Sequence, residues 1–155
     1  MPADRRPRWS HLARRLFGTW RARPLDEDEL AWVRHRLRPV EFDLWTAMDW
    51  RDQRHALTVA HRFLEASATT VGADLAVVAA LLHDVGKSVA PLSTTERVLV
   101  ALVGARTDRQ RRYQQHEAIG LDMCRNAGTD PMVLDLLAGI GECDVLAALR
   151  RADDL

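Results

Sequence analysis

Apolar residues recur along most of this chain at intervals of three and four positions, the spacing that places side chains on one face of an α-helix. No segment alternates between apolar and polar residues with a period of two, so the pattern predicts no β-strand. We therefore expect an all-α protein, a helical bundle of seven to nine helices. The segments with helical spacing are 9–20, 26–37, 39–48, 52–68, 75–83, 91–103, 108–126, 131–137 and 144–152.

Turn and capping residues mark the ends of several of these segments. Acidic residues 26–29 stand where a helix N-terminus favours negative charge, and the Asp130-Pro131 pair is typical of a helix start. Asp74 is expected to cap the helix over 75–83, and Gly86 is expected to end it. That helix is apolar on nearly every side, which predicts that it lies at the centre of the core.

Length and composition describe one ordinary globular domain, or one domain with an arm. The chain has 155 residues, of which 47% are hydrophobic and 28% charged. Its apolar runs fall short of the ~18–20 residues of a membrane span, and its arginine-rich start lacks the apolar stretch of a secretory signal. Two cysteines, Cys124 and Cys143, make neither a disulfide framework nor a paired metal motif. These features predict a cytoplasmic protein in a reducing compartment.

The net charge of zero hides an asymmetry between the first 24 residues and the rest. Residues 1–24 hold seven arginines and one acid, a net charge of +6, and residues 25–155 carry −6. This basic N-terminal arm is expected to pack on its own domain, whose charge is complementary. The alternative is a weak contact with an anionic membrane or an acidic partner. The arm is amphipathic, and its apolar helical face consists of Trp9, Leu12, Ala13, Leu16, Phe17 and Trp20.

The candidate chemistry centres on the stretch Leu82-His83-Asp84-Val85-Gly86-Lys87, at the end of the most apolar helix. Lys87 is the one lysine among 22 basic residues, and it closely follows the one His-Asp pair. Together with His55 and Asp153, that pair forms a mixed nitrogen and oxygen set that suits Mn, Fe, Co, Ni or Zn. The alternative for each residue is ordinary: a histidine satisfied within the core, or an aspartate on the solvated surface near the end of the chain.

The order of these residues resembles the HD superfamily of metal-dependent phosphohydrolases. His55 stands in Arg-His-x-x-x-Val-Ala, and His83 and Asp84 stand in Leu-Leu-His-Asp-x-Gly-Lys. Asp153 follows in Ala-Asp near the end of the chain. The resemblance covers about residues 50–155.

The resemblance implies an HD-like helical domain over 25–155 that binds a metal inside the bundle. Its ligands are expected to be His55, His83, Asp84 and Asp153. One divalent transition metal is expected, Mn, Fe, Co, Ni or Zn, with Mg as an alternative. Asp84 and Lys87 are then the expected catalytic residues, Asp84 at a metal-bound water and Lys87 at a phosphate.

Some members of this family bind two metals through additional histidines. His116, in His-x-x-x-Gly, resembles one of these ligands, but the histidine pair expected ahead of the last aspartate is missing from residues 137–142. Glu142 is a candidate replacement, with Asp144 close by. We favour one metal, and the departure also favours a weakened activity.

Two arginines beside the expected ligands, Arg54 and Arg150, are candidates for a phosphate contact, although an ordinary surface arginine is the simpler interpretation of each. The function implied by the resemblance is hydrolysis of a small phosphorylated substrate, a nucleotide by analogy with the family. The alternative is a catalytically weakened HD module that binds a metal, a ligand or a protein partner without turnover. The chain has no Gly-rich phosphate loop and no base-reading motif, so we expect no sequence-specific binding of nucleic acid.

Overall fold

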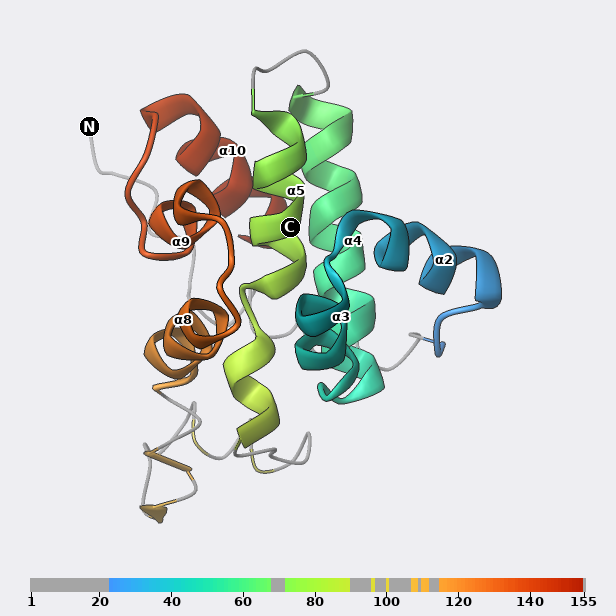
Figure 1. Ribbon diagram of the computed structural model, residues 1–155, viewed down its shortest axis with the longest axis vertical. Helices are drawn as coiled ribbons and strands as arrows, with labels where there is room; N and C mark the ends of the chain where they lie inside the picture. Colours follow the sequence, from blue (N-terminus) through green and yellow to red (C-terminus); the bar gives the residue numbers. More distant parts are fainter. Residues whose placement is uncertain are drawn as a thin grey trace, which may run out of the picture.

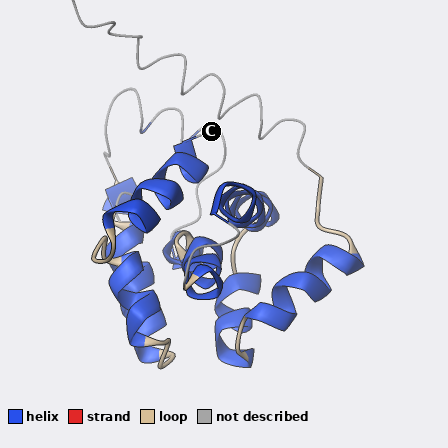
Figure 2. Ribbon diagram, turned by 90° about the horizontal axis from the view of Figure 1, so that it is seen from above, coloured by secondary structure: helices blue, strands red, loops and turns tan. Residues whose placement is uncertain are grey.

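A computed structural model of the protein describes residues 23–67, 72–89, 96, 100, 107–108, 110–111 and 115–154. Figure 2 shows that the regular structure in this part of the chain is helical, without a strand, so the all-α prediction is confirmed there. The elements with defined bounds are α2 (Glu27–Arg36), α3 (Pro39–Thr46), α4 (Trp50–Ser67), α5 (Ala73–Leu82), the 3-10 helix η1 (Val85–Val89), α8 (His116–Asn126), α9 (Pro131–Leu137) and α10 (Cys143–Asp154) (Figure 1).

Two predicted segments lie outside the described residues. They are the arm, of which only residues 23 and 24 are described, and nearly all of 91–103. The proposed contacts of the arm therefore stay predictions. Among the helices that are described, none is both long enough and apolar enough to cross a membrane.

The helices α4 and α5 pack side by side at the centre of the bundle (Figure 1). Helices α2 and α3 lie on one side of this pair, and α8, α9 and α10 lie on the other (Figure 1). The predicted central position of α5 is confirmed, because most of its side chains are buried. The predicted inward face of α4 is also buried, and it consists of Ala56, Val59, Ala60 and Phe63.

The predicted helix starts at Asp26 and Asp130 are confirmed by their hydrogen bonds. The Asp26 carboxylate accepts from the Glu29 backbone N–H at 3.0 Å, and the Glu29 carboxylate accepts from the Asp26 N–H at 2.9 Å. This reciprocal pair is a capping box. The Asp130 carboxylate accepts from the Met132 N–H at 2.8 Å, with proline as the first helical residue.

Both predicted ends of α5 are wrong. Gly72 occupies the N-cap position with φ 83°, and Asp74 lies inside the first helical turn instead. Acids are favourable at both positions, so the residue type did not distinguish them. At the other end α5 stops at Leu82, and Gly86 is buried inside η1 rather than terminating α5.

Gly86 is needed because another backbone passes directly over it. A Cβ atom built at this position would overlap the carbonyl oxygen of His116 and lie 2.7 Å from the backbone nitrogen of Gly120. The first turns of α8 therefore rest on η1 with no side chain between them. This contact brings His116 beside the His-Asp pair.

The helix predicted over 108–126 is confirmed in its second half, and the described residues Asp108, Gln110 and Arg111 of its first half are helical ahead of a break at Gln115. A capping box between Thr107 and Gln110 starts a helical turn at Asp108. Gln115 is a turn residue, and α8 begins only at His116. The stretch before His116 is almost entirely polar, so no apolar pattern marked the break.

We expect Gly86→Ala to lower the free energy of unfolding by about 2–3 kcal/mol, because the new methyl group has no space between η1 and α8. Gly128→Ala is a matched control, since a Cβ there meets no atom within 4 Å and only its φ of 67° is unfavourable, which costs about 1 kcal/mol. Urea unfolding followed by circular dichroism measures both. Equal losses in the two variants would contradict the close packing of η1 and α8.

Candidate metal centre

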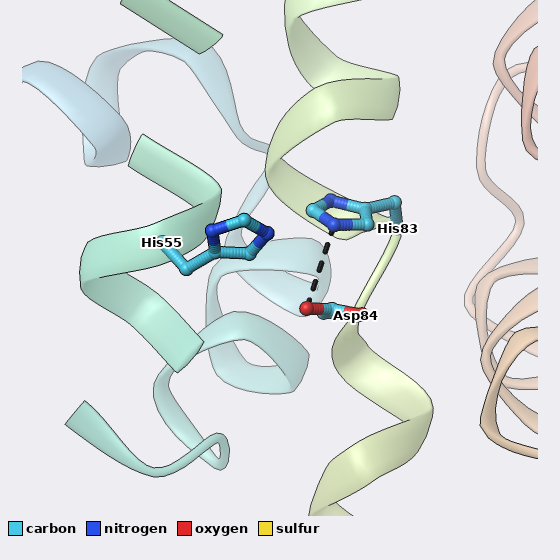
Figure 3. Close-up of side chains that lie close together, drawn as sticks. All are labelled: His55, His83 and Asp84. Carbon is cyan, nitrogen blue, oxygen red and sulfur yellow. Dashed lines mark ion pairs between the residues drawn. The ribbon is translucent and has the colours of Figure 1, made fainter. Parts of the chain in front are cut away.

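Four predicted ligands converge from three parts of the bundle. His55 comes from α4, His83 and Asp84 follow α5, and Asp153 comes from α10. Figure 3 shows the rings of His55 and His83 next to each other, inclined edge to face, with the Asp84 carboxylate below them. His55 Nε2 lies 2.8 Å from Asp153 Oδ1, and His83 Nε2 lies 3.4 Å from Asp84 Oδ2 and 3.7 Å from Asp153 Oδ1.

These side chains fit a divalent transition metal. One donor atom each from His55, His83 and Asp84 lies within 4.8 Å of the others. Ligands of such ions stand ~2.0–2.2 Å from the metal, so donor atoms on one ion are separated by only a few ångströms. The mixed set of imidazole nitrogens and carboxylate oxygens is also the donor chemistry that Mn, Fe, Co, Ni and Zn accept.

The orientation of His83 is that of a metal ligand. Its Nδ1 lies 2.7 Å from the carbonyl oxygen of Ala80, which can only accept, so Nδ1 carries a hydrogen and donates it. In the neutral ring the lone pair is then on Nε2, the nitrogen that faces Asp84 and Asp153. A backbone carbonyl that fixes the tautomer in this way is typical of metal-binding histidines.

The charges of the cluster depend on one another. Burial raises the pKa of the Asp84 carboxyl, but His83, His116 and Lys87 outweigh it and hold that pKa well below its usual range. Burial likewise raises the pKa of Asp153, but its hydrogen bond with His55 and the nearby ring of His83 outweigh this effect, so the pKa is lowered. For His83, burial lowers the pKa, but the charges of Asp84 and Asp153 outweigh it and raise the pKa. The carboxylates are therefore ionised and ready to hold a cation.

The Lys87 side chain is largely buried and contacts the Asp84 carboxylate. Its ammonium group forms an ion pair with Asp84 Oδ2 and lies 4.0 Å from Oδ1 of Asp52. Asp52 is a buried acid on α4 that sequence reasoning used only as a helix start. The sequence contains one indication that Asp52 lies near the site. It stands three residues before His55, and this spacing places both side chains on one face of the helix.

His116 approaches the same carboxylate from the other side. It is the first residue of α8, and its Nε2 lies 3.4 Å from Asp84 Oδ1. Glu142, the candidate replacement ligand, is exposed in the loop before α10 and does not form part of the compact donor group.

The two candidate arginines have different surroundings. Arg54 makes a bidentate ion pair with Glu29, at 2.5 and 2.7 Å, and also donates to the carbonyls of Arg23 and Pro24. Its guanidinium thus connects α4 to α2, and its role at a phosphate stays a prediction. Arg150 is exposed on α10, one turn before Asp153.

A cavity of about 350 Å³ opens beside the cluster, and its volume is that of a small ligand pocket. His83 and Asp153 form part of its lining. Arg150 and Glu117 supply further charged groups, and much of the remaining wall is apolar. Those apolar residues include Val59, Leu82, Leu121, Leu136, Leu137, Leu146 and Leu149.

The Arg54 pair predicts a pH-dependent contribution to stability. The hydrogen bond from Arg54 is the main cause that lowers the pKa of Glu29 from 4.5 to about 2. The pair therefore stabilises the fold above pH 4.5 and loses this effect as the pH falls toward 2. Glu29→Gln should lower the unfolding free energy at pH 7 by about 1 kcal/mol, and the difference from wild type should shrink below pH 4.5. Glu27→Gln, which removes an exposed acid from the same turn, is the control.

We expect His83→Ala and Asp84→Ala each to abolish tight binding of a divalent metal, because each removes one of few ligands. Wild-type protein loaded with Mn should melt at a higher temperature than metal-free protein, and the two variants should show no such shift. His61→Ala is the control, since His61 lies on α4 but packs against Trp32. A wild type that binds none of Mn, Fe, Co, Ni and Zn would contradict the site.

Comparison with known families agrees with this geometry. The family model for the HD domain matches residues 53–146, more than half of the chain. The match includes His55, His83 and Asp84 and ends before Asp153, which the structure adds to the cluster. No curated protein and no solved structure shows a significant match. From the extent of the family match and the all-helical architecture, the chain belongs to the HD domain family.

Proposed function

We propose that this protein is a metal-dependent phosphohydrolase that cleaves a small phosphate ester, with a nucleotide as the substrate class that its family suggests. The observation that carries the proposal is the convergence of four ligand-type side chains beside a cavity. His55, Asp153 and the adjacent pair His83 and Asp84 come from three separate parts of the bundle, and His83 and Asp153 also line that cavity. A phosphate placed there would lie next to the metal site.

In this proposal the four residues hold one divalent ion. A bound ion lowers the pKa of a water molecule and polarises a phosphoryl oxygen, which is the chemistry that phosphoester hydrolysis requires. The protein's contribution is to keep both carboxylates ionised and the imidazole of His83 in one orientation. The hydrogen bond from His83 to Ala80 and the ion pair of Asp84 with Lys87 do this.

The cavity supplies the remaining parts of a substrate site. Arg150 stands one turn from Asp153 in the cavity wall, where its guanidinium can bind phosphate oxygens. The leucine side chains of the wall can pack against the organic part of the ester. Glu117 is the other charged group in the wall and repels additional phosphates on its side.

One observation favours a second function, a module that binds a metal or ligand without turnover. Residues 137–142 lack the histidine pair of two-metal relatives, and Glu142 is exposed outside the donor group. The proposal is tested by measuring phosphate release from p-nitrophenyl phosphate and a panel of nucleotides, with Mn, Mg, Co or Ni added. Bound metal without hydrolysis of any of these would favour the binding module.

Lys87→Ala should retain bound metal and lower kcat by roughly 10–100-fold, because partners of ligand side chains have effects of this size. Removal of the ammonium takes a positive charge away from Asp84, the residue expected at the metal-bound water, and removes no metal ligand. Steady-state kinetics with the best substrate, together with metal analysis, measures this. A variant with unchanged kcat would remove Lys87 from the mechanism. A rise in KM alone would instead indicate a direct contact with the phosphate.

A further inference from the structure

Three charged side chains with little exposure lie together at the metal site, and one of them, Asp84, is an expected ligand. Asp52 belongs to α4, Asp84 follows α5, and the Lys87 ammonium lies between their carboxylates. The side chains are 6%, 3% and 12% exposed, respectively, so water screens them poorly. The three side chains have a net charge of −1, and they join the helix that carries His55 to the His-Asp pair.

In this arrangement Asp84 would have to bind two cations at once, the Lys87 ammonium and the metal ion. Asp84 Oδ2 is in contact with the Lys87 ammonium, and the same oxygen faces Nε2 of His83 at 3.4 Å. The other oxygen, Oδ1, faces His116. A metal ion held by His83 and Asp84 would thus share a carboxylate with an ammonium group, and two cations so close together repel strongly where water is excluded.

Asp52 offers the Lys87 ammonium a second negative charge. Its Oδ1 lies 4.0 Å from the Lys87 ammonium, close enough for a strong electrostatic attraction in a buried site. We propose that Asp52 is a positioning residue that takes up the positive charge of Lys87, so that Asp84 keeps its negative charge for the metal. This inference rests on the proposed metal site and concerns metal affinity, whether or not the protein is an enzyme.

The proposal predicts a specific pattern of metal affinities. Asp52→Asn should weaken Mn binding by roughly tenfold or more, the usual size for a partner of a ligand, because Lys87 then neutralises Asp84 alone. Lys87→Met should bind Mn at least as tightly as wild type. The double variant Asp52→Asn/Lys87→Met should recover most of the lost affinity, because the charge that Asp52 offsets is gone.

Recovery in the double variant distinguishes this role from a structural one. If Asp52 only supports the fold, its loss and the loss of Lys87 should add, and the double variant should bind worst. Asp43→Asn is the control, because it removes the same charge from an exposed position on α3. Isothermal titration with Mn gives the affinities, and circular dichroism verifies that each variant is folded.

The results of the Mn titration separate the role of Asp52 from the proposed hydrolase activity. Unchanged affinity in Asp52→Asn, or a further loss in the double variant, overturns the role of Asp52 and leaves the proposed hydrolase intact. The predicted pattern without any phosphate release supports the role of Asp52 and overturns the hydrolase. If Asp52→Asn does not fold, weaker Mn binding by Lys87→Met alone overturns the inference. A wild type that binds no Mn overturns the inference together with the metal site.

Discussion

A buried carboxylate without a partner is strongly destabilising, and Asp84 is 3% exposed at the centre of this bundle. Its position is possible because His83, His116 and Lys87 surround it with groups that favour the ionised form. Those three groups come from the end of α5, the start of α8 and η1. The interactions that stabilise the Asp84 carboxylate therefore connect the same elements that form the candidate metal site.

The backbone packing beside the site also brings these partners to Asp84. The close approach of η1 at Gly86 to α8 at Gly120 leaves no room for side chains between these elements, and it brings His116 to Asp84. On the opposite side, α4 carries both His55 and Asp52, one helical turn apart, toward the end of α5. Helix packing thus explains why residues distant in sequence share one cluster, without any long functional loop within the described part of the chain.

The features that the sequence predicted correctly are determined by residues close together along the chain. The capping residues Asp26 and Asp130 and the apolar run of α5 act within a few residues of their own position, and the His-Asp motif is short enough to recognise. Gly86 was misinterpreted because its neighbour is a backbone segment thirty residues later. Arg54 pairs with Glu29, and Asp52 lies near Lys87; these are tertiary contacts that no spacing in one helix reveals.

The central claim is that His55, His83, Asp84 and Asp153 hold one metal ion. A crystal structure of protein loaded with Mn, with anomalous differences recorded to locate the ion, tests it most directly. We predict one anomalous peak per chain, bonded to these four side chains, with His83 Nδ1 still donating to Ala80. Two peaks bridged by Asp84, or a peak that none of the four residues contacts, would contradict this account.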